Sequence, residues 1–442
     1  MDSTLSFNAE ARPQPSDEDL EFEIHKHDFP KDFIFGTAVS AFQVEGAKKG
    51  SGRGFTRWDE FTHMFPDKVE HGDDADMGVD FYTRYKIFNL MDQNLPSEDF
   101  REFAKFCFEN FGDRVKNWAT FNEPSVYSVA GYSKGKKAPG RCSPFEVLKC
   151  PSGDSSEEPY KVTHNQILSH LAAVEEFRKC VKCQENGGKI GIVFLRPLTY
   201  GHYPTVMQKD VNVRLPEFTK EESEKLKKSL DFVGLNYYGA FFTTPLTNIN
   251  ASELSYTNDV GAKLSAEQNH SPHLKTTSMG IVIYPAGLMN LLRHIQDEYK
   301  NPEIYIMENG MDEIDNGTKT VAEATNDYGR KEFIKSHILI MGKAIRLHNV
   351  RLKGYYIWSL MDNFEWERGY KMRFGLYYVD YDDNLKRHMR SSGKWLSEFL
   401  DSKESLHKCY FEDHREKGYA PKLFDTEYLD PNNWRLSYAS DI

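Results

Sequence analysis

Two glutamates each stand at the end of a short apolar run, beside an amide side chain and a turn-forming residue. One is Glu123, in Thr-Phe-Asn-Glu-Pro (residues 120–124), and the other is Glu308, in Ile-Met-Glu-Asn-Gly (306–310). Short apolar runs are typical of buried strands, so both carboxyl groups are expected at strand ends. Two carboxylates placed in this way are what cleavage of a glycosidic bond requires. One protonates the leaving oxygen, and the other attacks or stabilises the sugar carbon.

Strand-like and helix-like segments alternate along the chain, which predicts a parallel sheet with crossover helices. Chemistry at the carboxyl ends of several strands favours a (β/α) barrel over a doubly wound sheet. No Gly-rich phosphate loop follows the first strand, which argues against a nucleotide-binding fold. Six strands can be assigned, over residues 33–38, 115–122, 189–194, 230–238, 303–308 and 352–360. A closed barrel of this type needs about eight, so we expect an α/β fold of the (β/α)8 type that is incomplete.

The helices are predicted from hydrophobic periodicity and from end signals. Ser97 precedes an apolar face that recurs at helical spacing as far as Phe111, with Glu98 and Asp99 in the first turn. Further helices are expected over residues 79–90, 160–183, 220–230, 284–299, 326–348 and 393–400. Loops are expected at 46–76, 129–159 and 243–279.

Three regions are expected. Residues 1–28 form a polar extension without the basic start and apolar stretch of a secretory signal. Residues 29–400 form the barrel with internal deletions, and residues 401–442 form a polar, aperiodic tail.

The composition limits the partners. The chain has 442 residues and a net charge of −11, without a Lys/Arg-rich block. An acidic surface repels nucleic acid and anionic membranes, so a neutral small molecule fits better. No apolar run is long enough to span a membrane. Cys180-Val181-Lys182-Cys183 has no second ligand pair at zinc spacing, so we expect a structural role for it and predict no metal or cofactor.

At this point five motifs match a known family. They are Phe-Pro-Lys-Asp-Phe-Ile-Phe-Gly-Thr-Ala (29–38) with Gln-Val-Glu-Gly-Ala (43–47), the segment 120–124, Tyr-Pro-Ala-Gly-Leu (284–288), Glu-Asn-Gly (308–310) and Trp-Ser-Leu-Met-Asp-Asn-Phe-Glu-Trp (358–366). In this order they resemble the family 1 glycoside hydrolases, specifically the plant β-glucosidases. The resemblance covers residues 29 to about 400.

The resemblance implies a role for each matching residue. Glu308 is the nucleophile that forms a glycosyl-enzyme intermediate, and Glu123 is the acid and then the base. The implied substrate-binding residues are Gln43, Asn122, Tyr238, Trp358, Glu365 and Trp366. Of these, Asn122 contacts the sugar 2-hydroxyl and Tyr238 donates a hydrogen bond to the nucleophile. Glu365 places an anion near the outer hydroxyls, which would repel 6-phospho sugars.

Cysteines and sequons bear on the compartment. Cys142 and Cys150 flank a Pro- and Ser-containing loop and could close a disulfide, and they match a loop disulfide of the family. N-glycosylation sequons occur at Asn250, Asn269 and Asn316. The family resemblance implies the secretory pathway (endoplasmic reticulum, vacuole or extracellular space), whereas no signal peptide is visible, so the compartment stays open. The oligomeric state is equally open.

Two family segments have no counterpart here. An Arg-Phe-Ser-Ile-Ser-Trp-like second strand and a His-Trp-Asp third strand are missing, because Lys86-Ile87-Phe88 leads directly into the helix that should follow the third strand. The helix after the fifth strand is also predicted to be missing. The absent arginine would have paired with Glu308, so its loss removes a cation that lowers the pKa of that carboxyl group.

Several functions remain open at this stage. The first is a retaining β-glucosidase that acts on small O-glucosides, because Glu123 is a true acid where related thioglucosidases carry glutamine. The second is an inactive or misfolded relative with at most weak sugar binding. A thioglucosidase or an endo-glucanase is a third reading, disfavoured by the motifs.

Overall fold

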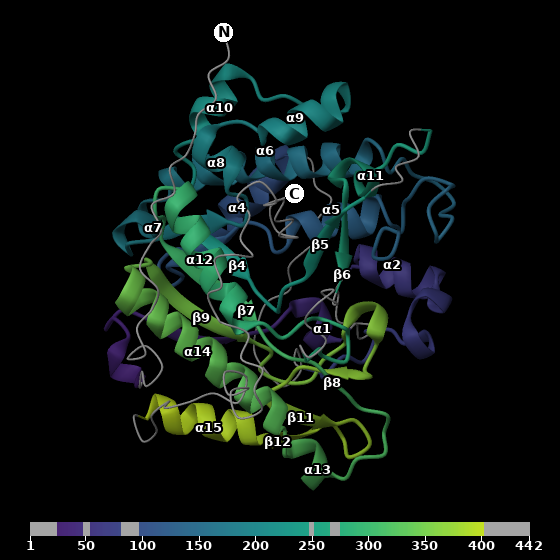
Figure 1. Ribbon diagram of the computed structural model, residues 1–442, viewed down its shortest axis with the longest axis vertical. Helices are drawn as coiled ribbons and strands as arrows, with labels where there is room; N and C mark the ends of the chain where they lie inside the picture. The colour runs from purple at the N-terminus through teal and green to yellow at the C-terminus, as the bar shows by residue number, and fades with distance from the viewer. Residues whose placement is uncertain (1–23, 47–53, 81–96, 247–251, 266–274, 402–442) are drawn as a thin grey trace.

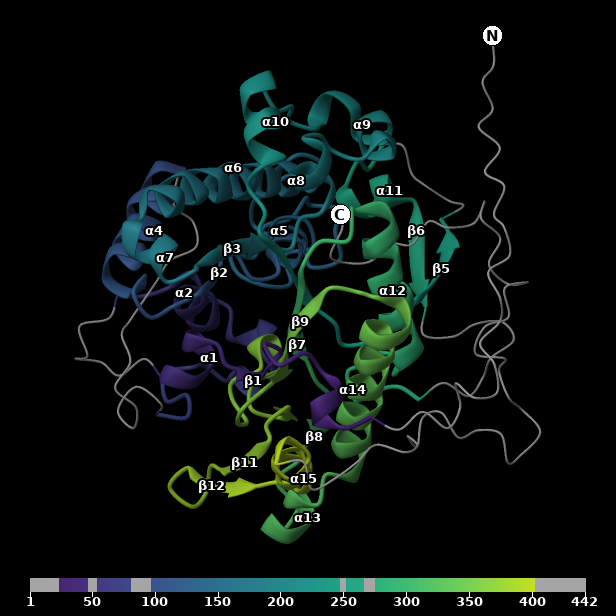
Figure 2. The same ribbon diagram turned by 90° about the vertical axis from the view of Figure 1, so that its left-hand side faces the viewer.

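The centre of the molecule is a six-stranded parallel sheet in the order β1-β9-β7-β4-β3-β2 (Figures 1 and 2). The computed structural model describes residues 24–46, 54–80, 97–246, 252–265 and 275–401. The strands are β1 (Ile34–Ala38), β2 (Asn117–Ala119), β3 (Lys189–Ile192), β4 (Phe232–Asn236), β7 (Ile304–Asn309) and β9 (Leu352–Trp358). Five lie within the predicted strand regions, and β7 extends one residue beyond its region, to Asn309. Every pairing in the sheet is parallel.

The sheet is a (β/α)8 barrel left open. β1 and β2 are its two end strands, and each pairs with one neighbour in the described part of the chain. All residues of these two strands are exposed or half-buried, whereas the inner strand β4 is buried except at its last residue. Parallel strands are ordinarily covered on both faces. The incomplete barrel expected from the sequence is therefore confirmed.

Three helices cover the middle of the sheet. They are α12 (Pro285–Glu298), α14 (Tyr328–His348) and α15 (Ser391–Leu400), and with β4, β7 and β9 they enclose the largest apolar cluster. Figure 2 shows α12 and α14 beside β7 and β9. Ile24, within the segment assigned to the polar extension, is fully buried in this cluster. The Ile24 side chain packs against Gly342 on α14, where an added Cβ would lie 2.0 Å from Ile24 Cδ1. The chain therefore contacts the barrel before residue 29.

A second group of helices covers the β2 end of the sheet. It consists of α4 (Ser97–Phe111), α6 (Glu158–Lys179) and α7 (Val181–Glu185). One continuous helix was predicted over residues 160–183, and this was wrong. Cys180 leaves the helical conformation with φ −72° and ψ 98°, so α6 ends there and α7 begins.

Other boundaries also differ from expectation. β2 has three residues because it pairs only with β3 in the described chain. The predicted loop at 129–159 begins with the end of α5 (Pro124–Tyr132), which Pro124 starts, since proline suits the first helical position. The predicted loop at 243–279 contains a hairpin, β5 (Phe242–Pro245) with β6 (Ala262–Ser265), and α11 (Tyr256–Val260). The predicted helix 79–90 lies mostly outside the described residues.

The remaining elements are short. Between β3 and β4 the chain forms α8 (Arg196–Tyr200), α9 (Thr205–Val211) and α10 (Lys220–Leu226) in place of one long helix. The others are α1 (Ala41–Glu45), α2 (Arg57–Met64), β8 (Glu313–Ile314), α13 (Val321–Thr325), β10 (Met372–Arg373), β11 (Tyr377–Asp380), β12 (Lys386–Met389) and five 3-10 turns, η2 (Lys26–Asp28), η3 (Pro66–Lys68), η4 (Glu70–Gly72), η5 (Asn212–Arg214) and η6 (Trp366–Arg368). Of the helices described, none has the length and apolar character needed to cross a bilayer.

Candidate active site

Glu123 lies on the turn between β2 and α5. Its φ is +45°, in the left-handed region that residues other than glycine rarely adopt. Such a backbone costs on the order of 1–3 kcal/mol, and residues held in it cluster at active sites. The side chain is half-buried and its Oε1 accepts a hydrogen bond of 3.1 Å from Asn236 Nδ2. The turn therefore holds this carboxyl group against the end of β4.

Asn236 is the last residue of β4 and connects the two acidic segments. Its Nδ2 also donates to Asn122 Oδ1 at 3.0 Å, and Asn122 in turn hydrogen-bonds the carboxylate of Glu308. Its Oδ1 is buried without a hydrogen-bond partner in the described chain, which leaves an acceptor at the site. The sequence analysis gave Asn236 no role. The feature of the sequence that could have indicated a role for Asn236 is its position at the end of a predicted strand, two residues before Tyr238.

Glu308 is near the end of β7, and its half-buried side chain faces Tyr238. The Tyr238 hydroxyl donates to Glu308 Oε2 at 2.6 Å. Burial and the neighbouring Glu308 raise the pKa of Tyr238 well above its usual value, so the phenol keeps its proton and remains a donor. The hydrogen bond expected from the resemblance is thus present in the structure.

The ionisation of Glu308 is unfavourable in this site. Burial raises its pKa to about 8, and the charges of Glu123 and Glu365 add to this, while hydrogen bonds from Tyr238 and Asn122 oppose it. No lysine or arginine of the described chain forms an ion pair with Glu308. An unpaired carboxyl group among other acids keeps its proton to higher pH. At neutral pH the neutral form of Glu308 therefore predominates.

Asn309 fixes the end of β7 relative to its neighbours. Its side chain is fully buried, Nδ2 donates to the Tyr237 carbonyl at 2.6 Å, and Oδ1 accepts from the Tyr355 hydroxyl at 2.8 Å. Tyr355 belongs to β9 and Tyr237 follows β4. These bonds join the end of β7 to the residue after β4 and to the middle of β9, so the position of Glu308 depends on the packed centre of the sheet.

Gln43, Trp358 and Glu365 come from three separate elements and meet beside this pair. Gln43 on α1 is buried, and its Nε2 donates to the Phe364 carbonyl at 2.8 Å and lies 3.4 Å from Glu365 Oε2. Trp358, at the end of β9, is buried and hydrogen-bonds Glu365. The structure thus brings together the residues that were implied to bind sugar hydroxyls.

The anion expected at Glu365 is disfavoured by burial. Burial raises the pKa of Glu365 to about 8. The charge of Lys137 and the hydrogen bond from Trp358 oppose this rise but do not cancel it. Burial thus favours the neutral acid form of Glu365. It can then both donate and accept a hydrogen bond to a sugar hydroxyl, and its charge no longer argues against 6-phospho sugars.

Trp366 belongs to an aromatic group that sequence analysis did not find. Its ring stacks on Phe42, with centroids 5.8 Å apart, and lies 4.7 Å from the ring of Trp58. The ammonium group of Lys137 sits 5.5 Å from the Trp366 ring centre. Phe42 lies on α1, directly before Gln43, and Trp58 lies on α2. Only the fold brings them to Trp366.

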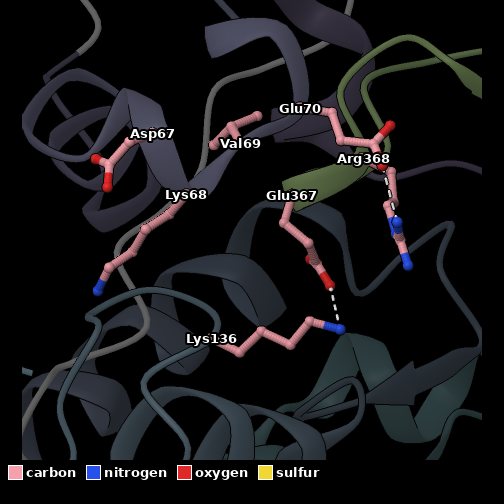
Figure 3. Close-up of a pocket in the computed structure, with 7 residues that line it drawn as sticks. All are labelled: Asp67, Lys68, Val69, Glu70, Lys136, Glu367 and Arg368. Carbon is pink, nitrogen blue, oxygen red and sulfur yellow. Dashed lines mark hydrogen bonds and ion pairs between the residues drawn. The ribbon is translucent and has the colours of Figure 1, made fainter. Parts of the chain in front are cut away.

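A separate pocket of about 290 Å³ lies on the loop that follows Trp366 (Figure 3). Glu367 reaches Lys136 at 3.2 Å, and Arg368 reaches Glu70 at 2.8 Å. Neither Glu123 nor Glu308 lines this pocket. The first ion pair joins η6 to the segment that follows α5, and the second joins η6 to η4.

One group of side chains in the described chain has the chemistry of metal ligands. The ligand atoms of His63, Asp74 and Asp76 lie within 4.8 Å of one another. His63 already pairs with Asp76 at 3.2 Å, and all three side chains are about one-third exposed or more. The group lies apart from the two glutamates, and we assign it no part in the chemistry.

The cysteines and the sequons are placed as follows. Cys142 and Cys150 form a disulfide, and so do Cys180 and Cys183, a pairing the sequence analysis did not state. Asn316 is exposed, so its sequon is accessible. Asn250 and Asn269 lie outside the described residues.

Comparison with known proteins places the chain in a family. The family model described as glycosyl hydrolase family 1 matches residues 25–94, 91–200 and 191–405. The three parts meet close to the two predicted deletions. β-Glucosidase 33 of Arabidopsis thaliana is 57% identical over 595 aligned positions, which cover 99% of this chain and 97% of that protein. The alignment is longer than the 442 residues of this chain, so the relative carries segments that are missing here.

Solved structures agree with this assignment. A rice β-glucosidase in a covalent complex with glucose has a TM-score of 0.79 and 32% identity, covering 84% of this chain and 98% of that one. A β-glucosidase of the fungus Humicola insolens in complex with glucose has a TM-score of 0.77 and 27% identity, covering 85% and 99%. The chain therefore belongs to glycosyl hydrolase family 1 and is a glycoside hydrolase on an incomplete (β/α)8 barrel.

Proposed function

We propose that this chain hydrolyses terminal β-D-glucosyl residues of small O-glucosides by double displacement, with retention of configuration. The observation that carries the proposal is the chain of hydrogen bonds that links Glu123 through Asn236 and Asn122 to Glu308. Carboxyl groups of retaining enzymes lie about 5–5.5 Å apart. A bridge of amide side chains between the two glutamates is consistent with such closeness. The rice relative holds glucose covalently, which accords with this mechanism.

The proposed steps use each carboxyl group twice. Glu308 attacks the anomeric carbon while Glu123 gives its proton to the leaving oxygen. Glu123 then takes a proton from water, which displaces Glu308 and releases glucose. In the intermediate Glu308 is an ester without charge, so Glu123 no longer faces a neighbouring anion and can act as a base. Asn122 is placed to bind the 2-hydroxyl.

Binding of the sugar is assigned to the residues around this pair. Gln43 and Glu365 would hold the outer hydroxyls, and Trp358 and Trp366 would line the sugar ring. No cofactor is required for any step. The proposed ligand is a small β-glucoside, and the aglycone is set by variable loops.

The raised pKa of Glu308 predicts slow turnover near neutral pH. The nucleophile must be ionised, and with a pKa of about 8 only about one-tenth of it is ionised at pH 7. The missing second strand would have supplied an arginine. Its loss and the open edges at β1 and β2 favour the second candidate, an inactive relative that binds sugar weakly.

Hydrolysis of a nitrophenyl β-D-glucoside between about pH 6 and pH 9 separates these candidates. We expect turnover that rises with pH and is absent in Glu308→Gln. In a second arm, a 2-deoxy-2-fluoro-β-glucosyl fluoride should label Glu308. The 2-fluoro group slows both formation and hydrolysis of the intermediate, whereas the good leaving group speeds formation alone, so the intermediate accumulates. Peptide mapping identifies the labelled residue. If the wild type is no more active than Glu308→Gln and no residue is labelled, the proposed hydrolase activity is refuted and the chain is an inactive relative. A thioglucoside and a long β-glucan test the remaining alternatives.

A further inference from the structure

The Cys180–Cys183 disulfide has no part in the proposed function. Both disulfides of the described chain are closed, yet their settings differ. Cys142 and Cys150 are both buried, with 0% and 7% of their surfaces exposed. Cys183 is also fully buried, whereas Cys180 is half-exposed at the junction of α6 and α7. Cys180 is therefore the partly exposed member of this pair, and Cys183 is the shielded one.

The surroundings of Cys180 suit a thiolate. Its Sγ accepts a hydrogen bond of 3.2 Å from the Cys183 N–H, a contact that favours negative charge on sulfur. Arg178, Lys179 and Lys182 flank it in the sequence, and nearby cations stabilise a thiolate. Two of these cations are partly neutralised, because Arg178 pairs with Asp231 at 2.6 Å and Lys179 with Glu176 at 2.8 Å. Lys182 donates to a backbone carbonyl of α4.

Packing restricts which sulfur can move. Cys183 belongs to an apolar cluster with Phe108, Phe177 and Ile190. A Cβ on Gly112 would lie 2.5 Å from Cys183 Sγ and 3.1 Å from Cys180 Sγ, so both sulfurs press against the end of α4. Two thiols need more separation than a bonded pair. Cys180 can supply it by turning outward, while Cys183 stays in the core.

We propose that Cys180–Cys183 is a thiol–disulfide exchange site that accepts electrons from a thiol reductant. A reductant thiolate attacks Cys180 Sγ, the bond to Cys183 breaks, and Cys183 leaves as a thiolate that takes up a proton. A second reductant thiol, as its thiolate, attacks the reductant sulfur of the mixed disulfide and releases Cys180. The protein gains two electrons and two protons, and the reductant becomes a disulfide.

The Cys142–Cys150 disulfide serves as an internal control, because it is exposed to the same reductant in the same sample. The protein is incubated with dithiothreitol, quenched at intervals with an alkylating reagent, and each cysteine is followed by mass spectrometry. We expect Cys180–Cys183 to open on the order of tenfold faster than Cys142–Cys150, with Cys180 alkylated before Cys183. Equal rates, or faster opening of Cys142–Cys150, would overturn the proposal.

Single-cysteine variants test the direction of attack. Cys183→Ser leaves Cys180 free, and with oxidised glutathione it should form a mixed disulfide at Cys180. Cys180→Ser leaves only the buried Cys183, which should form at most about one-tenth as much. Similar yields at both positions would refute the assigned roles. Native melting behaviour of each variant shows that the comparison is made on folded protein, and the dithiothreitol arm needs no variant.

Discussion

Removal of the Tyr238 hydroxyl should move the pH dependence of the enzyme rather than only lower its rate. The hydroxyl donates to Glu308 Oε2 at 2.6 Å, and it opposes the effects of burial and of the neighbouring acids on that carboxyl group. A hydrogen bond to a charged group contributes about 1.5–3 kcal/mol. Since one pKa unit corresponds to about 1.4 kcal/mol, Tyr238→Phe should raise the pKa of Glu308 by about 1–2 units.

The expected kinetic change follows from the ionised fraction. With the pKa of about 8 in the wild type, about one-tenth of Glu308 is ionised at pH 7. An increase of about 1–2 units cuts this fraction about 10- to 100-fold. In Tyr238→Phe, kcat/KM for a nitrophenyl β-glucoside should fall by that factor at pH 7 and recover as the pH rises.

Tyr237→Phe is the matched control. Its hydroxyl donates to the Tyr284 carbonyl at 2.7 Å, away from Glu308. The control should keep the wild-type acid limb of the pH profile even if it is less stable. A loss in Tyr238→Phe that is uniform at all pH values would refute the electrostatic reasoning, as would an unchanged acid limb.

Four further changes have expected outcomes. Asn236→Leu removes the donor that Glu123 and Asn122 share, and it should lower kcat about 10- to 100-fold. A decrease in kcat below about twofold would contradict the bridging role of Asn236. Glu365→Gln should raise the melting temperature increasingly from about pH 5 to pH 8. The wild-type carboxyl group, whose folded pKa is about 8, loses stability as pH rises through that window, whereas the amide does not titrate. The exposed variant Glu221→Gln is the control. If Glu365→Gln shows no larger pH-dependent gain in melting temperature than this control, the reasoning is contradicted. Gly135→Ala should destabilise more than Gly187→Ala by at least about 1 kcal/mol in denaturant unfolding. Both glycines have positive φ, but a Cβ at Gly135 meets Cys150 Sγ at 2.0 Å, whereas nothing described lies within 4 Å at Gly187. Insertion of the missing segment of the Arabidopsis relative between Lys86 and Pro96 should shift the acid limb of the pH profile downward by about 1–2 units, because an arginine would then face Glu308. An unchanged limb in a folded chimera would contradict the role of the missing cation.

Local patterns in the sequence located the two carboxyl groups that are proposed to act in catalysis. Apolar runs that end in a polar turn mark strands whose carboxyl ends bear functional groups, and Glu123 and Glu308 were found in this way. The six strands and the open barrel followed from the same patterns and from the missing segments. The family and the enzyme class predicted from five ordered motifs are confirmed.

Features that depend on distant contacts were not predictable in this way. Asn236 and Phe42 stand in no recognisable motif, and only the sheet brings Asn236 between Asn122 and Glu123. The helix breaks at Cys180, where both cysteine sulfurs pack against Gly112 at the end of α4, a contact that the sequence does not show. The raised pKa of Glu365 was not predicted, because residue type alone says nothing about desolvation.

The sequence by itself determined which groups can perform the reaction and in which order the strands carry them. The tertiary structure decided their state of ionisation. Coulomb interactions and desolvation depend on distances between residues that are far apart in the chain, and these distances exist only once the sheet forms. In this chain they place Glu308 among acids without a paired cation in the described residues, so the proposed nucleophile is expected to ionise mainly at alkaline pH.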